Sequence, residues 1–255
     1  MERTKVRAFD LFCGAGGSSV GARQAGAQVV GGVDLWPLAT QTFLLNFPKA
    51  KAYTTNIVDL SPYDVLWNVG PIDLLLASPE CTHHSVAKGA KPRDEASKRL
   101  AFEILRFAEV LQPRWVVVEN VIQMQSWPAF GDWRRALKEL GYQVRVLKLD
   151  AHSFGVPQHR RRLFVICDSQ REPAMPRPYR KAGATAASVL CHGGSEGTPW
   201  PFRPLDSDRR ATATLERARR AIQELGDREA FLLVYYGSDG AGGWQLLDRP
   251  SSALR

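Results

Sequence analysis

The feature that most constrains the fold is a regular alternation of short β-branched runs with amphipathic stretches over the first two-thirds of the chain. This alternation is typical of βαβ units, and it predicts a doubly wound, mostly parallel α/β sheet. We expect ligands at the carboxyl ends of its strands. The expected strands lie near residues 6–12, 29–34, 72–77, 115–119, 143–149 and 162–167, and the expected helices near 18–25, 37–46, 96–111 and 130–140.

The third expected helix has the clearest pattern, because five apolar side chains share one of its faces and Pro113 follows its end. These side chains are Leu100, Ile104, Phe107, Ala108 and Leu111. After residue 168 the composition changes, and residues 171–210 are rich in Pro and Arg with little apolar periodicity. We therefore expect a first domain over 1–168 and a small loop-rich region over 169–255. The Pro-rich stretch is either a recognition region or a flexible linker leading to a helix near 213–225 and a strand-like run at 231–236.

The cysteines and the net charge narrow the class of protein. Four widely spaced cysteines (Cys13, Cys81, Cys167 and Cys191) contain no C-x-x-C pair, which favours reduced thiols over disulfides or a zinc ribbon. A formal charge of +8 suits a polyanionic partner, although many basic proteins bind no nucleic acid. The sequence contains no apolar run long enough to cross a bilayer and no signal-peptide core after Met1, so we expect a cytoplasmic protein.

A glycine-rich turn follows the first expected strand and opens a helix. Its glycines permit close approach of a ligand, and the exposed N–H groups favour a carboxylate or phosphate. Asp34 ends the second strand, where an acid can accept hydrogen bonds from ribose hydroxyls, and Trp36 can stack on adenine. The turn matches neither G-x-G-x-x-G nor G-K-[ST], which disfavours dinucleotides and ATP, and a purely structural turn stays possible. The expected cofactor-binding residues are Phe12, Gly14, Ala15, Gly16, Asp34, Trp36, Asn56, Ile57 and Pro79.

A second group of residues has the pattern of a catalytic site. A buried strand leads into a loop that carries Cys81, which is the position expected of a nucleophile. A cysteine packed in the core, or a metal-binding Cys-x-His-His motif, would give a similar sequence pattern. Glu119 ends the next apolar strand, and a carboxyl at such a place tends to have a shifted pKa. Arg160 and Arg162 lie in a basic loop that enters the last expected strand, where an ordinary surface loop is the plain alternative.

Taken in order, these segments resemble the cytosine C5 methyltransferase family. The motifs are D-L-F-C-G-A-G-G, the acid and Trp at 34 and 36, a P-x-C loop, E-N-V and G-V-P-Q-x-R-x-R, and they span about residues 6–168. The resemblance implies a Rossmann-like methyltransferase domain that uses S-adenosylmethionine, followed by a short target-recognition region. It also implies double-stranded DNA as substrate, in a restriction-type enzyme that is bacterial or phage-encoded and nucleoid-associated.

The resemblance gives each candidate catalytic residue a role. Cys81 would add to C6 of a flipped-out cytosine, which makes C5 able to accept the methyl group. Glu119 would hold N3 and the exocyclic amine, Arg162 would bind O2, and Arg160 would support the loop. The Lys- and Gly-containing loop at 86–98 would fill the space that the flipped base leaves.

Two departures from the family pattern keep alternatives open. Glu80 occupies the place where the family usually has Pro, and its carboxylate would tend to raise the pKa of the Cys81 thiol. The sequence also stops where the family usually continues into a final helix, which suggests a truncated chain, a second polypeptide that supplies the segment, or a compact form. The alternatives to DNA methylation are a non-catalytic member that binds DNA or cofactor and a tRNA cytosine C5 methyltransferase.

Overall fold

A computed structural model describes residues 5–79, 95–179, 185–189, 210–226, 230–234 and 243–251, with the side chains of 95–99 left aside. The chain divides into two compact units. The first comprises Met1–Lys148 and Arg162–Met175, and the second comprises Leu149–Arg161 and Pro176–Arg255. No helix within the described ranges is long and apolar enough to cross a membrane.

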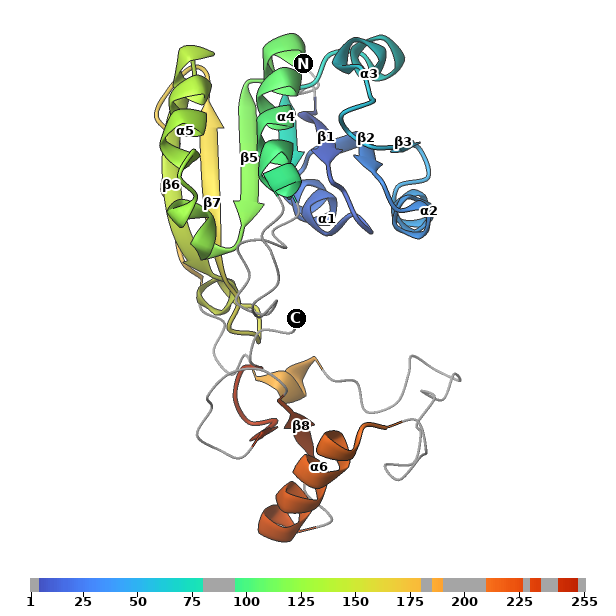
Figure 1. Ribbon diagram of the computed structural model, residues 1–255, viewed down its shortest axis with the longest axis vertical. Helices are drawn as coiled ribbons and strands as arrows, with labels where there is room; N and C mark the ends of the chain where they lie inside the picture. The colour runs from blue at the N-terminus through green and yellow to red at the C-terminus, as the bar shows by residue number, and fades with distance from the viewer. Residues whose placement is uncertain are drawn as a thin grey trace. The chain divides into compact units, whose positions relative to one another are not determined.

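The first unit is built on a seven-stranded sheet with the order β3-β2-β1-β4-β5-β7-β6 (Figure 1). Its strands are β1 (Arg7–Leu11), β2 (Gln28–Asp34), β3 (Lys51–Thr54), β4 (Leu74–Ala77), β5 (Trp115–Asn120), β6 (Gln143–Asp150) and β7 (Arg161–Asp168). Pairing is parallel from β3 through β5, whereas β5 and β7 run antiparallel. The chain builds outward from β1 to β3 and then returns to add β4 on the other side of β1. The switch point of the sheet therefore lies between β1 and β4, where ligands of such folds bind.

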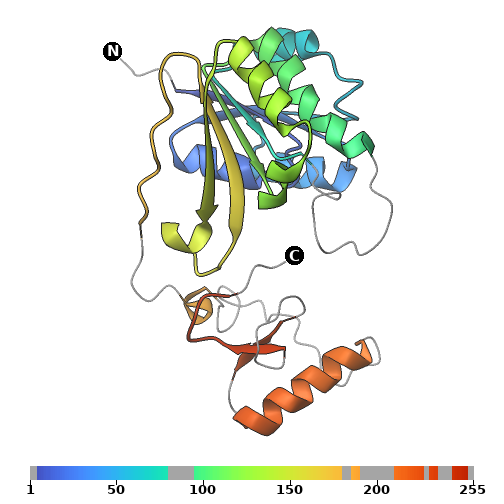
Figure 2. The same cartoon turned by 60° about the vertical axis from the view of Figure 1, so that its left-hand side comes forward.

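Helices cover both faces of this sheet. They are α1 (Gly17–Gln24), α2 (Pro37–Asn46), α3 (Pro62–Val69), α4 (Glu95–Leu111) and α5 (Phe130–Glu139), with a 3-10 turn η2 at Ile122–Ser126. Figure 2 shows α3, α4 and α5 together on one face, while α1 and α2 cover the other. The predicted doubly wound, mostly parallel α/β fold is confirmed.

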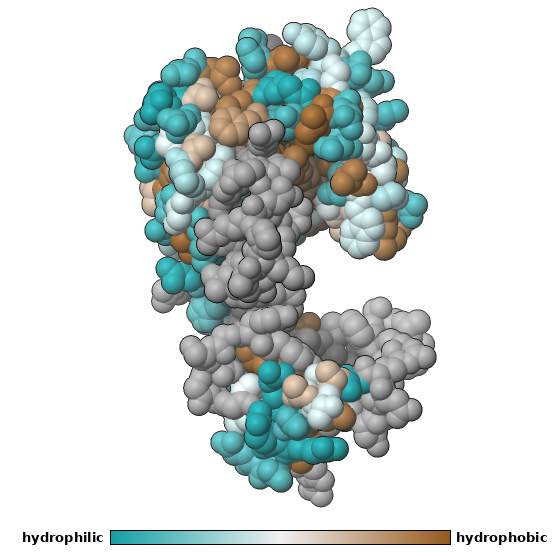
Figure 3. All heavy atoms as spheres, in the orientation of Figure 1, coloured by the Kyte–Doolittle hydropathy of each residue, from teal (hydrophilic) through white to brown (hydrophobic). Residues whose placement is uncertain are grey.

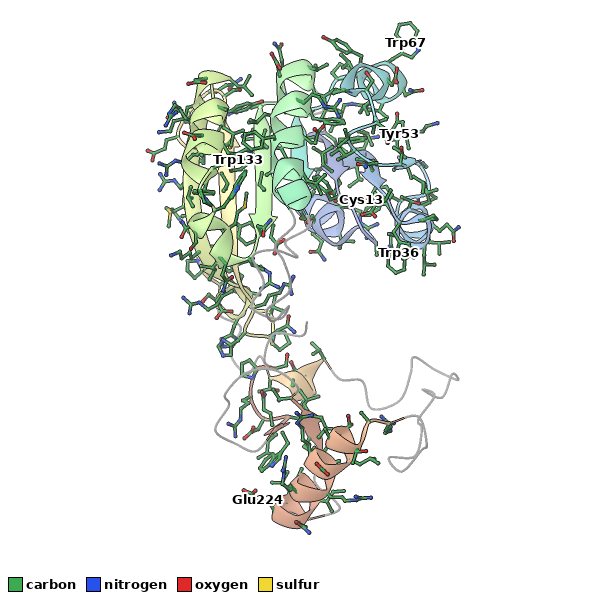
Figure 4. All side chains as sticks on the ribbon, in the orientation of Figure 1. Cys13, Trp36, Tyr53, Trp67, Trp133 and Glu224 are labelled. Atoms are coloured by element: carbon green, nitrogen blue, oxygen red, sulfur yellow. The ribbon has the colours of Figure 1, made fainter. Side chains whose placement is uncertain are left out.

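The core confirms the predicted face of α4. Ile104, Phe107, Ala108 and Leu111 are all buried, and they pack in the main apolar cluster with residues of β1, β4 and β5. Trp133 of α5 is fully buried in the same cluster, and its indole N–H donates to the carbonyl of Ala101 at 2.8 Å (Figure 4). Burial on both faces explains why the central strands are continuous apolar runs rather than alternating ones.

Two elements of the first unit were not among the predicted ones. Strand β3 is only four residues long, and α3 is a single short helix with residues at both ends that commonly start or end helices. Ser61 caps α3 through a hydrogen bond from the Tyr63 N–H, Pro62 occupies its first turn, and Gly70 ends it with a positive φ. These signals fix the ends of a helix but give too few residues for a period of 3.6 to be recognised.

The second unit contains a helix and a two-stranded antiparallel sheet. They are α6 (Thr212–Leu225), β8 (Phe231–Leu233) and β9 (Trp244–Leu246), and α6 contacts both strands. The predicted helix near 213–225 is confirmed, and the described part of the predicted 231–236 run is the strand β8. Two further short turns are η3 (Ala151–Phe154) and η4 (Ala186–Ser188). The Ser251 N–H donates to the Pro157 carbonyl at 2.9 Å, so the last described residues are tied to the loop before β7.

Candidate functional site

The turn after β1 has an unusual backbone. Phe12 has a φ of 61°, which is uncommon for a residue with a side chain, and Gly14 and Gly16 follow with φ values of 52° and 94°. A Cβ on Gly16 would lie 2.7 Å from Cε2 of Phe47. Strained or glycine-dependent backbone of this kind is concentrated at binding sites, where it brings N–H groups close to a ligand. The turn lies at the carboxyl end of β1, beside the switch point of the sheet.

Asp34 connects this turn to the end of β2. Its Oδ2 accepts the Gly14 N–H at 2.9 Å, and its Oδ1 accepts the Trp36 N–H at 2.9 Å. Each carboxylate oxygen has two lone pairs, so the side chain retains acceptor capacity for a ligand hydroxyl. Trp36 is 62% exposed next to α2, and the apolar ring is therefore available for stacking (Figure 4).

A cavity of about 620 Å³ opens at this end of the sheet. Its size falls in the range of small-molecule sites. The lining residues are Phe12, Val33, Asp34, Leu35, Trp36, Pro37, Thr55, Asn56, Ile57, Ser78 and Leu100. Five of the nine predicted cofactor residues are in this lining, whereas Gly14, Ala15 and Gly16 form the adjacent turn and Pro79 follows Ser78. The sequence interpretation did not name the other six lining residues, which are Val33, Leu35, Pro37, Thr55, Ser78 and Leu100.

The ends of β5 and β7 bring together two of the predicted catalytic residues. Nε of Arg162 lies 3.0 Å from Oε1 of Glu119, and both side chains are mostly buried, at 19% and 24% exposure. The antiparallel register pairs Glu119 with Phe164 and Asn120 with Leu163, which places Arg162 next to the carboxyl end of β5. The pair leaves a fixed carboxylate and a fixed guanidinium side by side, a combination suited to planar ligands with both donors and acceptors.

Asn120 joins this pair to the loop that follows β4. Its side chain is buried, its amide Nδ2 donates to the Pro79 carbonyl at 3.1 Å, and its Oδ1 accepts the Val121 N–H at 2.8 Å. Pro79 is the last described residue before Cys81, which lies outside the described residues together with Glu80 and most of the 86–98 loop. Asn120 is a functional candidate that the sequence interpretation did not single out, although it stands within the E-N-V motif.

Neither of the two described cysteines has the properties of a nucleophile. Cys13 lies beside α1 (Figure 4), Cys167 lies in β7, and both are free and buried. Desolvation by burial raises the pKa of each thiol above its ordinary value, and the carboxyls of Asp10 and Asp34 raise that of Cys13 further. Because the thiolate is the reactive form, neither of these residues is suited to attack a substrate.

Arg160 belongs to the second unit, in the loop before β7. Its backbone N–H donates to Oδ1 of Asp150 at 3.0 Å, and Nδ1 of His159 lies 3.1 Å from Oδ2 of the same carboxylate. Desolvation would raise the pKa of Asp150, but hydrogen bonds from His159 and from the His152 and Arg160 N–H groups outweigh it and hold the pKa below the usual value. This carboxylate therefore fixes the backbone that carries Arg160.

Comparison with known proteins identifies the family of this chain. The model of the C-5 cytosine-specific DNA methylase family matches residues 6–188. The chain belongs to this family. The match extends over the glycine turn, the cavity, the Glu119–Arg162 pair and the Cys81 motif, so the resemblance found in the sequence is confirmed.

Several related sequences are named Type II methyltransferases. Type II methyltransferase M.AgeI of Thalassovita gelatinovora is 33% identical over 195 residues, which are 72% of this chain and 45% of that protein. M.DdeI of Desulfomicrobium norvegicum is 32% identical, with 62% of this chain and 39% of that protein covered. For M.AquIA of Picosynechococcus sp. the identity is 31%, and the shares are 62% and 70%. The matched part of this chain thus spans about half the length of the first two relatives or less.

Solved structures agree on the fold. A DNA modification methyltransferase encoded within an E. coli prophage has a TM-score of 0.61 at 24% identity, and the match covers 84% of this chain and 64% of that one. The S. pombe Dnmt2 methyltransferase has a TM-score of 0.56 at 22% identity, with 68% and 52% covered. At these identities the likeness supports the shared architecture and nothing finer.

Proposed function

We propose that this chain acts in DNA (cytosine-5) methylation, transferring a methyl group from S-adenosylmethionine to C5 of a cytosine in double-stranded DNA. The observation that carries the proposal is the arrangement at the carboxyl edge of the sheet, where the cavity beside β1 reaches Ser78 and Asn120, next to Glu119 of the Glu119–Arg162 pair, donates to the carbonyl of Pro79. Membership of the family and the names of relatives such as M.AgeI support it.

The side chains that line the cavity support S-adenosylmethionine as the cofactor. Asp34 would accept the ribose hydroxyls, Trp36 and Ile57 would enclose the adenine, and Asn56 would supply an amide contact to it. The N–H groups of the turn from Gly14 to Gly16 would bind the carboxylate of the methionine part. When bound, the cofactor supplies an electrophilic methyl group on a positively charged sulfur.

The residues near β4 and β5 would then bind and activate the cytosine base. The Cys81 thiolate forms a bond to C6 of the cytosine, and a proton shared by Glu119 at N3 offsets the charge that develops in the ring. The electron pair released to C5 would form the bond to the methyl group, while the electrons of the broken sulfur–methyl bond would stay on sulfur and S-adenosylhomocysteine would leave. Loss of the C5 proton to a base and cleavage of the sulfur–C6 bond then return a neutral 5-methylcytosine and the free thiolate. Arg162 would bind O2, and Arg160 would support the loop.

The base must leave the DNA stack to reach this edge of the sheet. We assign the region over 169–255 to target recognition and the region over 1–168 to cofactor binding and catalysis. The face of α6 visible in Figure 3 is largely hydrophilic, and the exposed side chains of this helix include Arg219 and Arg220 together with Glu216 and Glu224. Together with the formal charge of +8, the arginines support contact with phosphates.

The biological setting is also part of the proposal. The names of the bacterial relatives favour a bacterial or phage-encoded restriction-modification enzyme that acts in the cytoplasm on the nucleoid. The relatives extend well beyond the matched part. We propose that the corresponding sequence, supplied by a further segment or by a second polypeptide, completes the working enzyme.

The test is transfer of a labelled methyl group from S-adenosylmethionine to mixed duplex DNA and to tRNA. The wild-type protein should label DNA as 5-methylcytosine, and Cys81→Ser should abolish the labelling. Cys191→Ser is the matched control, because this cysteine lies outside every motif, and it should retain activity. Duplex DNA with 5-fluorocytosine should trap the wild type covalently but not the Cys81 variant.

Each alternative result has a clear meaning. Label on tRNA alone would replace the DNA substrate by RNA. Cofactor binding without label on either polymer, with the candidate second polypeptide present, would contradict catalysis and leave a binding protein.

A further inference from the structure

Asp10, the last residue but one of β1, is a buried acid to which the mechanism assigns no role. It is 1% exposed, and the Ser19 hydroxyl donates to its Oδ2 at 2.6 Å. The backbone N–H of Ser19 also acts on this carboxyl and lowers its pKa. Ser19 itself is fully buried in the first turn of α1. The carboxyl of Asp10 therefore connects the centre of the sheet to the start of the helix that follows the cofactor turn.

This contact replaces a missing helix cap. The N-cap residue of α1 is Gly16, which has no side chain to bond the free N–H groups of the first turn, and that turn contains no acidic residue. Helix N-termini are stabilised by a carboxylate that accepts these N–H groups and complements the helix dipole. Asp10 places a carboxyl group of this kind beside the first turn of α1, where it accepts the Ser19 hydroxyl.

The cofactor turn is consequently held at both ends by carboxyl groups. Asp34 accepts the N–H of Gly14 at the start of the turn, and Asp10 accepts the hydroxyl of Ser19 after its end. Asp34 also lines the cavity. A change of charge at Asp10 thus acts on the same turn that would bind the cofactor, and on the potential near Asp34.

Opposing effects set the pKa of the Asp10 carboxyl near neutral pH. Desolvation by burial raises its pKa, the Ser19 hydrogen bonds lower it and Asp34 raises it again, with a result of about 7. Its Oδ1 is buried without a hydrogen-bond partner among the described residues. The ionised form therefore makes the better cap for α1, while the neutral form avoids a second buried negative charge near Asp34.

We propose that Asp10 is a positioning residue for the cofactor turn, and that binding of the positively charged cofactor drives the Asp10 carboxyl to release its proton to solvent. The inference rests on the proposed use of S-adenosylmethionine. A cation in the cavity beside Asp34 offsets the repulsion between the two carboxylates, and the carboxylate that results holds α1 and the turn more firmly. The cofactor and the proton therefore compete through Asp10.

Two titratable groups among the described residues interact with Asp10. They are Asp34 on β2 and Cys13 in the turn, and burial keeps the Cys13 thiol protonated. In the register, Asp10 pairs with Gly32 on β2 and with Leu76 on β4, and neither can ionise.

The test is calorimetric titration of the full chain with S-adenosylmethionine between pH 6 and 8.5, in buffers of different ionisation enthalpy. The wild type should release close to one proton on binding below pH 7, with affinity rising by up to about 10-fold per pH unit in that range. Asp10→Asn, which keeps an acceptor for Ser19, should bind without this release and with nearly constant affinity. Ser19→Ala should move the release to higher pH, because it removes a hydrogen bond that favours the ionised form.

S-adenosylhomocysteine, which lacks the positive sulfur, should release a smaller fraction of a proton. A purely structural role for Asp10 would lower the thermal stability of Asp10→Asn but leave the proton count unchanged, and that result would overturn the inference. If Asp10→Asn fails to fold, the proton release of the wild type still tests the inference, since zero release at pH 6 to 7 contradicts the coupling. Absence of binding at every pH would instead overturn the proposed cofactor, and the coupling with it.

Discussion

The two ends of the site are built in different ways. At the cofactor end, the decisive contacts lie within the first βαβ unit, where Asp34 bonds Gly14 and Asp10 bonds Ser19. At the base end, the contacts join separate parts of the sheet, with Glu119 paired to Arg162 and Asn120 bonded to the Pro79 carbonyl. The cofactor end can therefore form as soon as β1, α1 and β2 pack together. The base end requires β4, β5 and β7 to be in register.

This difference implies that substitutions at the two ends should affect different measurements. Changes at the cofactor turn should weaken cofactor binding, whereas changes at the base end should lower kcat and leave cofactor binding intact. A variant that alters both quantities equally would show that the two ends are coupled more tightly than their separate contacts suggest.

The largest effect is expected for Glu119→Gln at the base end. The amide is isosteric but cannot share a proton with N3, and it loses the charged partner of Arg162. We expect kcat to fall by roughly 100-fold or more, the usual range for loss of a general acid–base group, with little change in the Kd for S-adenosylmethionine. Glu172→Gln is the matched control, because Glu172 also pairs with an arginine but is 71% exposed. Equal loss of activity in both variants would contradict the assigned role.

At the cofactor end, Gly16→Ala should have the next largest effect. The added Cβ would meet the Phe47 ring at 2.7 Å, and the φ of 94° is strained for any residue with a side chain. We expect a loss of about 1–3 kcal/mol in stability and a weaker Kd for the cofactor. Gly17→Ala is a sharp control, since a Cβ there meets nothing within 4 Å and alanine favours the helix. Thermal unfolding and cofactor titration of both variants separate turn geometry from a general effect of the substitution.

The sequence predicts local features of the fold better than contacts between distant elements, in line with the difference between the two ends of the site. The apolar face of α4 repeats with the helical period, so Ile104 and Phe107 were correctly placed in the core. The spacing of Gly14 and Asp34 is set by one strand–helix–strand unit, so their proximity could also be anticipated. Helix α3 was missed because its few residues show caps but no period.

Contacts between distant elements carry no such signal. Leu100 lines the cavity only because of the way α4 lies on the sheet. The pairing of Arg162 with Glu119 needs the antiparallel register of β5 and β7. The sequence supplied these residue types in order, but only packing brings the side chains within bonding distance.

The smallest of these effects is expected for Asn120→Ala, which tests whether the base end depends on long-range contacts. The substitution leaves the Pro79 carbonyl and the Val121 N–H without their buried partner, at a cost of about 1–3 kcal/mol in stability. Because the Cys81 loop begins at Pro79, we expect kcat to fall by about 10-fold while the Kd for the cofactor stays constant. Asn68→Ala provides the control, since Asn68 makes the same kind of bond to the Asp64 carbonyl on the exposed side of α3. If Asn120→Ala instead weakens cofactor binding as strongly as Gly16→Ala does, the end of β5 also supports the cofactor site, and the separation of the two ends fails.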